Sequence, residues 1–339
     1  MPHVEIVPPF TTGAHWLIGA ETLLIDRVVP AVERMWLPPA YYSGGTITVH
    51  DIERGAGLAP TRGGLRMLRH KLRADRPPEP VSGLLVDMRE GTPQNFHHSI
   101  SVHLPMCEVA RRVLDAPFTV VLPSDTPGYV RRVFGACGYP IVTTEYGVPG
   151  DIVRVERDNM YNMLRDTGTP PLRRIAEAIL ASRPGGERAL PARVFLARRG
   201  TRFISNQAEI EAVLAPLGYE TVYPEDLSVS DQFRLLGEAT HVVAIHGAGM
   251  GPLLYRDPAR GPIMLVEILP AAHMTNVHRY FLDGVGGVYV GVRGRITPAD
   301  AAAAYAFGEM YTANSLKPFE VDPVSLRVAL DLAQEQFAA

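Results

Sequence analysis

HVVAIHGAGMGPLLY, residues 241–255, is the stretch of this sequence that decides its fold class. It contains a short apolar run, a glycine-rich turn with one histidine and a second apolar run, and PIMLVEILP (262–270) follows closely. Short apolar runs bounded by such turns are typical of the buried strands of a parallel sheet. The pattern therefore predicts an α/β protein whose ligand binds where strands meet helices.

The same alternation of strand-like and helix-like segments occurs on both sides of a linker. On the N-terminal side, SGLLVDM (82–88) is a strand candidate and the amphipathic segment 95–114 a helix candidate. PGGERALP (184–191) has the composition of a linker, and the alternation restarts at 192. We therefore expect two doubly wound domains, residues 1–184 and 185–315, followed by a C-terminal segment, residues 316–339, that carries an amphipathic helix.

Composition excludes several classes of function. With 339 residues, of which 46% are hydrophobic and 20% charged, the chain can bury two cores. Its net charge is −3, and no run of lysine and arginine occurs, which argues against nucleic-acid binding. The two cysteines, Cys107 and Cys137, lack metal-ligand spacing, and we expect buried, reduced thiols.

The sequence also bears on where the protein works. Residues 1–26 have no basic leader, and their apolar stretches are interrupted by proline, histidine and acids. No run of about 18 apolar residues occurs, so no transmembrane segment is expected. We expect a cytoplasmic protein. Peripheral association with the inner face of the membrane stays open, because short exposed apolar loops leave no clear mark in a sequence.

The glycine-rich turn is a candidate anion site. Gly247 and Gly249 permit close approach of a phosphate to the backbone at the expected start of a helix. His246, at the strand end, can donate to a phosphate or to a sugar hydroxyl. A structural turn without a ligand is the alternative reading, and the turn lacks the G-x-G-x-x-G spacing of dinucleotide sites.

Arginines and one acid strengthen the anion hypothesis. Arg198, Arg199 and Arg202 follow a predicted strand, and guanidinium groups match the oxygens of a diphosphate. Surface arginines without a ligand are the alternative. Asn206 is a plausible N-cap of the next helix. Glu267 closes an apolar run, where a carboxylate needs donors such as the hydroxyls of a ribose or hexose; pairing with an arginine or capping a helix is its alternative.

At these residues the sequence resembles glycosyltransferase family 61, which includes sugar transferases of the secretory pathway, plant xylan-decorating enzymes and bacterial members in polysaccharide loci. The resemblance covers roughly residues 92–290. The matching positions, in the family's order, are Asn95, Phe96, His98, Leu104 and Pro105 in NFHHSISVHLP, then Arg198, Arg202 and Asn206, then Gly218 and Gln232, then His246, Gly247, Ala248 and Gly249, and finally Glu267.

The resemblance implies a GT-B fold, in which two Rossmann-like domains face each other and a C-terminal helix returns to the first. It implies an inverting transfer, without an obligatory metal, from a nucleotide sugar to a hydroxyl acceptor such as a glycan in polysaccharide biosynthesis. We expect a uridine diphosphate sugar as co-substrate and no other cofactor. Donor binding would fall to Arg198, Arg202, Asn206, Glu267 and the turn His246–Gly249.

An inverting displacement needs one base to deprotonate the acceptor. Where family members tend to carry an acid four residues after the motif histidine, this chain has Val102. We rank His98 first, because its place near a helix start disfavours the imidazolium and keeps a neutral base. Asp87, at the end of the preceding strand, ranks second. A packed or capping histidine that only shapes the acceptor site is the alternative for His98.

Two other classes of function compete with a glycosyltransferase. A catalytically idle nucleotide-sugar-binding or scaffold subunit is suggested by Val102 in place of the acid. A nicotinamide-dependent oxidoreductase is disfavoured by the missing dinucleotide fingerprint. No motif in the sequence identifies the donor sugar or the acceptor.

Overall fold

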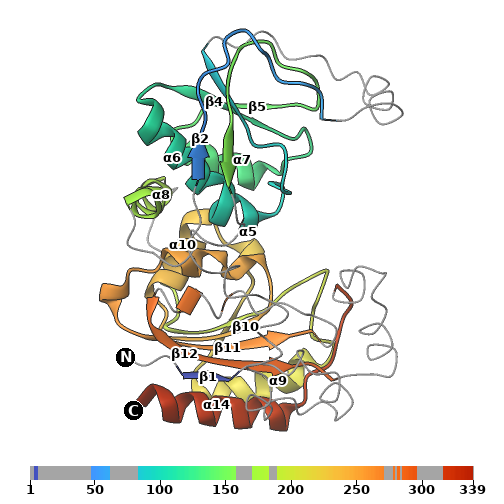
Figure 1. The fold of residues 1–339 in the computed structure, drawn as a ribbon. Helices are drawn as coiled ribbons and strands as arrows, with labels where there is room; N and C mark the ends of the chain where they lie inside the picture. Colours follow the sequence, from blue (N-terminus) through green and yellow to red (C-terminus); the bar gives the residue numbers. More distant parts are fainter. Residues whose placement is uncertain are drawn as a thin grey trace, which may run out of the picture. The chain divides into compact units, whose positions relative to one another are not determined.

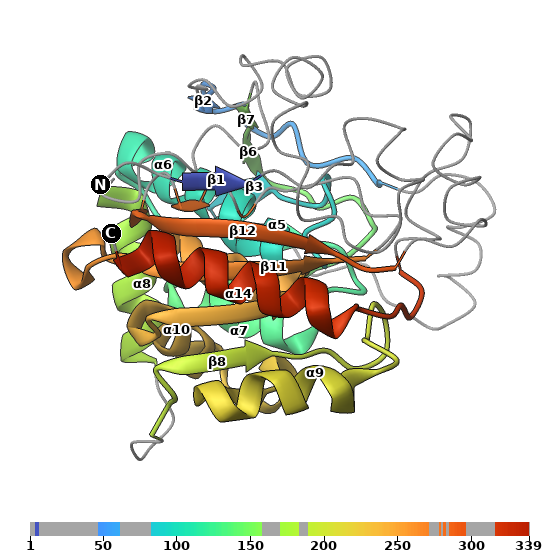
Figure 2. The ribbon, with the colours of Figure 1, turned by 90° about the horizontal axis from the view of Figure 1, so that it is seen from below.

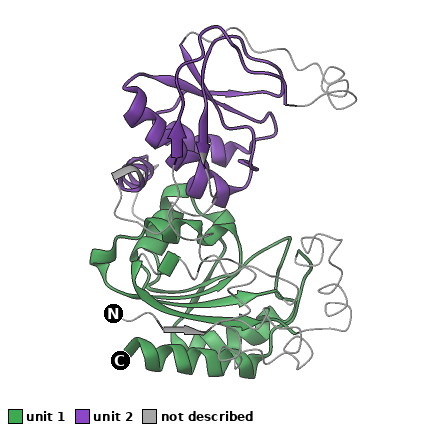
Figure 3. Ribbon diagram, in the orientation of Figure 1, with its two compact units in different colours: residues 1–43, 164–167, 184–339 green, residues 44–163, 168–183 purple. Residues whose placement is uncertain are grey.

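The computed structural model describes residues 4–6, 47–61, 83–157, 170–182, 189–270, 278, 281–282, 285–295 and 316–338. Two compact units are present (Figure 3). One consists of residues 44–163 and 168–183, and the other of residues 1–43, 164–167 and 184–339. The unit boundary at Pro184 falls at the start of the expected linker.

The C-terminal unit is built on a sheet of six strands, all parallel to their neighbours. Their order across the sheet is β1 (Val4–Ile6), β12 (Gly287–Arg293), β11 (Ile263–Leu269), β10 (His241–Ile245), β8 (Arg193–Leu196) and β9 (Glu220–Val222). If β8 to β12 are numbered 1 to 5 in chain order, the sheet read from β9 to β12 has the doubly wound order 2-1-3-4-5. The strand order reverses between β8 and β10.

The first strand corrects one predicted domain boundary. β1 pairs with β12, Val4 lying opposite Val288, so the start of the chain adds an edge strand to the C-terminal sheet. An N-terminal domain of residues 1–184 therefore begins too early. A three-residue strand at an edge gives no periodic signal of its own, and the sequence could not assign it to a sheet.

Helices cover both faces of this sheet (Figure 1). One face carries α9 (Gln207–Leu214) and α14 (Pro323–Ala338), which lie side by side across the strands in Figure 2. The opposite face carries α10 (Val229–Glu238) and η7 (Ala248–Tyr255). Covering on both faces explains why every residue of β10, β11 and β12 is buried.

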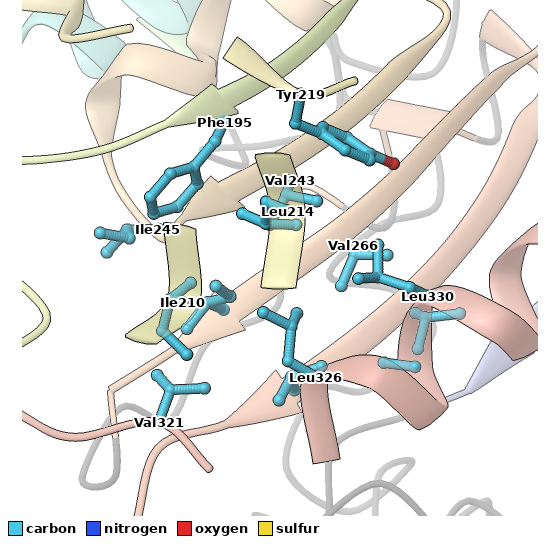
Figure 4. Packing of buried hydrophobic residues seen from close by; sticks show 14 of the residues in the cluster. Phe195, Ile210, Leu214, Tyr219, Val243, Ile245, Val266, Val321, Leu326 and Leu330 are labelled. Atoms are coloured by element: carbon cyan, nitrogen blue, oxygen red, sulfur yellow. The ribbon is translucent and has the colours of Figure 1, made fainter. Parts of the chain in front are cut away.

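The C-terminal helix belongs to the core of its own unit. Leu326 and Leu330 of α14 pack with Val266 of β11 and Val243 of β10, and Figure 4 shows their side chains directed toward those of the strands. The expectation that residues 316–339 return to the N-terminal domain is therefore wrong. The apolar face of α14 instead covers the valine-rich face of β11 and β12.

The N-terminal unit contains a parallel sheet in the order β5 (Ile141–Thr143), β4 (Phe118–Leu122), β3 (Leu84–Asp87) and β6 (Asp151–Val153). If β3 to β6 are numbered 1 to 4 in chain order, this sheet has the order 3-2-1-4, and the strand order reverses between β3 and β6. A separate antiparallel pair joins β2 (Ile47–Val49) to β7 (Val155–Arg157). The described helices of the N-terminal unit are α5 (Phe96–His98), η3 (Ser99–His103), α6 (Leu104–Leu114), α7 (Gly128–Ala136) and α8 (Pro170–Ala181).

The described part of the C-terminal unit also contains short 3-10 helices: η5 (Ala215–Leu217), η6 (Pro224–Asp226) and η8 (Pro258–Arg260).

Both predicted cysteine thiols are reduced and buried, and burial raises the pKa of Cys137 to about 12. In the part of the chain that the structure describes, no helix has the length and apolar character needed to cross a bilayer. The predicted α/β class with parallel sheets is confirmed.

Candidate functional site

Two strand ends lie together at the switch point of the C-terminal sheet. β8 and β10 are neighbours, with Leu196 opposite Ala244. Arg198 follows β8 and His246 follows β10, so both leave the same edge of the sheet. In open parallel sheets, ligands bind outside the carboxyl ends of the strands where the strand order reverses. The two predicted residues thus stand where the topology favours a ligand.

The guanidinium of Arg198 packs against the turn after β10. Its Nη1 donates to the carbonyl of His246 at 3.0 Å, and its Nη2 donates to Thr201 Oγ1 at 3.3 Å. A Cβ at Gly247 would lie 1.5 Å from Nη1, so any larger residue there would push this guanidinium out of its position. Burial lowers the pKa of Arg198, and Glu225 opposes the effect. A desolvated guanidinium interacts more strongly with an anion than a hydrated one does.

Arg202 brings a second positive charge to this edge. It has a left-handed backbone, with φ 59°, and its N–H donates to the carbonyl of Leu316 at 3.0 Å. Burial is the main cause of the lowered pKa of His246, and the charge of Arg202 adds to it. The structure therefore brings Arg198 and His246 together at one edge of the sheet, and Arg202 follows in the loop after β8.

The glycine-rich turn does not open the expected α-helix. Gly247 precedes η7, a 3-10 helix that contains Pro252. Proline has no N–H and clashes with the preceding turn of an α-helix, which accounts for the tighter helix. Ala248 and Gly249 are partly exposed, and the first N–H groups of a helix have no partner within it. A Cβ at Gly249 would lie 2.8 Å from Pro224 Cγ, so this glycine also serves packing.

Glu267 lies within a buried hydrogen-bond network. Its Oε1 accepts from Nδ1 of His246 at 2.5 Å and from Nδ1 of His278 at 2.8 Å, and its Oε2 accepts from the Tyr289 hydroxyl at 2.7 Å. The Glu267 side chain is 0% exposed. The prediction that Glu267 binds ribose or sugar hydroxyls is corrected: its oxygens already receive three donors inside the fold.

Burial sets the protonation of this network. It lowers the pKa of His246 to about 4, and Glu267 opposes the effect. Burial favours the neutral form of Glu267, but the charges and hydrogen bonds of His278 and His246 outweigh it and hold the pKa of Glu267 well below its usual range. At neutral pH a neutral His246 thus donates from Nδ1 to a carboxylate. Its lone pair is then at Nε2, which accepts from a hydroxyl and does not donate to a phosphate, contrary to expectation.

His246, Glu267 and His278 also have the chemistry of a metal site. Among the described residues, their ligand atoms all lie within 4.8 Å of one another. A nitrogen that binds a metal carries no proton, so a metal bound at the two Nδ1 atoms would replace both Nδ1–H bonds to Glu267. The residues as they stand fit a hydrogen-bond network.

Asn206 occupies the N-cap position of α9, as predicted, but its side chain makes no capping hydrogen bond and serves the fold instead. Its Nδ2 donates to the carbonyl of Val321 at 2.8 Å, and its Oδ1 accepts from the N–H of Val321 at 3.0 Å. Arg199 pairs with Asp226 through two bonds and lies 3.7 Å from the centre of the Tyr223 ring. Both side chains make these contacts within the fold, whereas Arg198 packs against the turn after β10.

The N-terminal motif forms one continuous helix with a π-helical turn. Asn95 caps it, because its Oδ1 accepts from the N–H of His97 at 2.9 Å. Pro105 is at the start of α6 and cannot donate to the carbonyl four residues before it, which explains the wider turn Ser99–His103. Phe96, Leu104 and Pro105 are buried packing residues.

His98, the first-ranked base, is partly buried where α5 meets η3. Its Nδ1 lies 2.5 Å from Thr92 Oγ1 and 3.3 Å from the carbonyl of Gly91. Both contacts come from the loop after β3, which starts at the switch point of the N-terminal sheet. Val102, at the position of the missing acid, is 1% exposed and lies in the core.

Asp87, the second-ranked base, is already engaged. Nε of Arg89 donates to its Oδ1 at 2.8 Å, and Nη2 of Arg89 donates to its Oδ2 at 2.7 Å. Arg89 also donates to the carbonyls of Tyr146 and Ala59, at 3.0 and 2.7 Å. A carboxylate that an arginine holds with two bonds is a poor proton acceptor. The structure therefore favours His98 over Asp87.

Several partners at both sites were not predicted. They are Arg89, Thr92, His278 and Tyr289. Tyr289 had one usable signal: a polar group within the apolar strand GVYVGV must find a hydrogen-bond partner when it is buried. The other three had none, because their contacts depend on strand pairing and loop geometry.

The chain is an α/β protein with cationic side chains and a glycine turn at the switch point of a parallel sheet, where open α/β sheets generally bind their ligands. The chain belongs to glycosyltransferase family 61: the family model described as Glycosyltransferase 61 matches residues 53–261. Glycosyl transfer is therefore its general class of activity.

Two solved structures are similar to this chain. One is E. coli heptosyltransferase WaaC with ADP, 12% identical, with a TM-score of 0.30 over 68% of this chain and 100% of that chain. The other is the same enzyme with ADP-2-deoxy-2-fluoro heptose, 12% identical, with a TM-score of 0.30 over 67% of this chain and 98% of that chain. None of the curated proteins compared with this chain matches it.

Proposed function

We propose that this protein is an inverting, metal-independent glycosyltransferase that moves a sugar from a uridine diphosphate sugar to a hydroxyl acceptor such as a glycan. The observation that carries the proposal is the partly buried guanidinium of Arg198 against Gly247, at the switch point of the C-terminal sheet, with Arg202 in the same loop after β8. Two guanidinium groups there suit a diphosphate, the leaving group of this reaction. The GT-B arrangement of the two units is part of the same proposal.

The proposed reaction is a single displacement. The base takes the proton of the acceptor hydroxyl, and the acceptor oxygen forms a bond to the anomeric carbon from the face opposite the leaving group. The bond from that carbon to the diphosphate oxygen breaks, and both of its electrons leave with the diphosphate. Arg198 and Arg202 stabilise the negative charge that develops there. One displacement inverts the anomeric centre.

We assign the base to His98. An imidazole with its proton on Nδ1 offers the lone pair of Nε2 to an acceptor hydroxyl. Thr92 and Gly91 both contact Nδ1, which supports that tautomer. His246 takes a different role in this proposal: its Nε2 accepts a hydrogen bond from a hydroxyl of the donor, and Glu267 orients its ring.

Donor binding tests the proposal most directly. Thermal unfolding would be followed with uridine, guanosine, cytidine and thymidine diphosphates, since a ligand that binds the native state raises the unfolding temperature. We expect the largest shift with uridine diphosphate. Arg198→Ala is expected to remove most of the shift, and the adjacent Arg199→Ala to keep it, because Arg199 is paired with Asp226. Equal shifts in both variants would remove Arg198 from the site.

Turnover separates the enzyme from an idle binding subunit, which the buried Val102 still motivates. The protein would be incubated with a panel of nucleotide sugars and hydroxyl acceptors, and the free nucleotide would be measured. We expect release that depends on the acceptor and that His98→Ala reduces by about 100-fold or more. Binding of a nucleotide without release across the panel would favour the idle subunit.

A further inference from the structure

The loop between β3 and α5 has an unusual backbone at Thr92. This threonine has φ 56°, and the preceding Gly91 has φ 74°. Left-handed backbone suits glycine, but a β-branched residue adopts it only at a cost of about 1–3 kcal/mol, when surrounding structure enforces it. The loop therefore accepts a strained residue where glycine would fit better, which points to a use for the threonine side chain.

The surrounding structure does fix this loop. Arg89 joins Asp87 to the carbonyls of Tyr146 and Ala59, and its side chain is 1% exposed. The N–H of Asn95 donates to the carbonyl of Thr92 at 3.0 Å. Nε2 of His103 lies 2.8 Å from the carbonyl of Glu90. Contacts of Arg89, of Glu90 and of Thr92 itself thus hold its backbone in the strained conformation.

The side chain of Thr92 is directed to His98. Its Oγ1 lies 2.5 Å from Nδ1 of His98 and 2.8 Å from the carbonyl of Gly91, and the hydroxyl donates to that carbonyl. A hydroxyl has one proton, so when it donates to the Gly91 carbonyl it can only accept from the ring. The same carbonyl lies 3.3 Å from Nδ1. With the hydroxyl donating to Gly91, both oxygens near Nδ1 are acceptors, which favours the tautomer of a neutral His98 ring that carries its proton at Nδ1.

We propose that Thr92 is a positioning residue for His98. Its hydroxyl, held by the left-handed backbone, fixes the ring in the Nδ1–H tautomer and directs the basic lone pair of Nε2 to the acceptor hydroxyl. The proposal rests on the proposed function for its catalytic consequence. The tautomer itself depends only on the contacts among Gly91, Thr92 and His98.

Three variants separate this role from a structural one. Thr92→Val keeps the size and the branched Cβ but loses the hydroxyl. Thr92→Ser keeps the hydroxyl and removes a methyl group. Thr92→Gly loses the hydroxyl but relieves the strained backbone. The proposal expects kcat to fall by about 10- to 100-fold in the valine and glycine variants, with KM of the donor unchanged, and to recover in the serine variant. The glycine variant should also unfold at a higher temperature than the wild type.

The tautomer of His98 is measured independently of activity, from the ¹⁵N chemical shifts of its ring in the full chain, assigned by comparison with His98→Gln. We expect Nδ1–H in the wild type and in Thr92→Ser, and a smaller share of that tautomer in Thr92→Val, where the 3.3 Å contact with the Gly91 carbonyl is the remaining acceptor at Nδ1. An unchanged tautomer in Thr92→Val would overturn the proposal, as would unchanged kcat in an active wild type. If the wild type transfers no sugar, the proposed function fails, and the ring shifts alone decide whether Thr92 positions His98.

Discussion

His246 and Glu267 are joined by a 2.5 Å contact between Nδ1 and Oε1, and both side chains are buried at the carboxyl end of the C-terminal sheet. The same residue links this pair to Arg198, because the backbone carbonyl of His246 accepts a hydrogen bond from the Arg198 guanidinium. A carboxylate behind an imidazole fixes the tautomer and the orientation of the ring. Any effect of Glu267 on a ligand is therefore expected to pass through His246.

Replacing Glu267 by Gln tests this relationship. The amide keeps the shape but loses the charge, and its NH2 group faces a histidine donor or the Tyr289 hydroxyl in either orientation. We expect the free energy of unfolding to fall by about 3 kcal/mol, because a buried charged network loses one partner, and nucleotide affinity to fall with it. Urea unfolding and nucleotide titration measure both. Glu220→Gln, on exposed β9, is the matched control and should change neither. A Glu267→Gln variant as stable as the wild type would contradict the network.

Replacing Gly247 by Ala separates binding from folding. The new Cβ would displace the guanidinium of Arg198, which is the flexible end of a side chain, so the cost in stability stays below about 1 kcal/mol. Affinity for uridine diphosphate should fall at least 10-fold. Gly237→Ala is the control: its Cβ would meet nothing within 4 Å, and alanine favours the helix α10 by about 0.5–1 kcal/mol. Unchanged affinity in Gly247→Ala would show that the position of Arg198 is irrelevant to the ligand.

Much of this fold was predictable because local pattern and tertiary structure agree in it. β8, β10 and β11 are short apolar runs closed by turns, and that length and those turns mark strands buried on both faces. Where strand pairing decides the structure, the sequence alone could not predict it. DIVRVE, residues 151–156, has the pattern of one strand, but the structure divides it at Arg154: β6 joins the parallel sheet and β7 pairs with β2.

The candidate sites show the same division. Arg198 and His246 were predictable, since the ends of parallel strands converge whatever the details of packing. The roles of Glu267 and Asn206 were not, because their partners are distant in sequence. Tyr289 reaches Glu267 through the pairing of β11 with β12, and Val321 reaches Asn206 through the segment before α14. Donor and acceptor counts show that such groups need partners but not which partners they find.

Acid should destabilise the C-terminal unit through His246. Its pKa falls from 6.5 to about 4 on folding, so between these values the unfolded chain binds more protons than the folded one. The contribution of His246 to the free energy of unfolding is fully present above pH 6.5 and decreases as the pH falls toward 4. The loss is about 3 kcal/mol at 1.36 kcal/mol per unit of pKa shift. Glu267, with its lowered pKa, adds loss of the same sign at lower pH. Urea unfolding of the wild type and of His246→Gln between pH 4 and 8 measures the difference. Parallel profiles of stability against pH for the two proteins would refute the lowered pKa of His246.

Replacing Asn206 by Ala should affect the fold more than the ligand. The side chain makes two hydrogen bonds to the backbone of Val321, and their loss leaves both groups without this partner. We expect a loss of about 1–3 kcal/mol in the free energy of unfolding. Affinity for uridine diphosphate, measured well below the unfolding temperature, should stay within about 2-fold. Loss of affinity in a variant of near wild-type stability would return Asn206 to the donor site.

The position of α14 leads to the last prediction. Leu326 is 0% exposed within the core of the C-terminal sheet, whereas Val324, two residues earlier on the same helix, is 68% exposed. Leu326→Ala should lower the free energy of unfolding by about 2–5 kcal/mol, because the sheet cannot close the cavity fully. Val324→Ala should change it by less than about 0.5 kcal/mol. Hydrogen exchange of the strands locates the effect: faster exchange in β11 and β12 is expected with Leu326→Ala, while faster exchange only in β3 and β4 would place the helix on the N-terminal unit and contradict the packing described here.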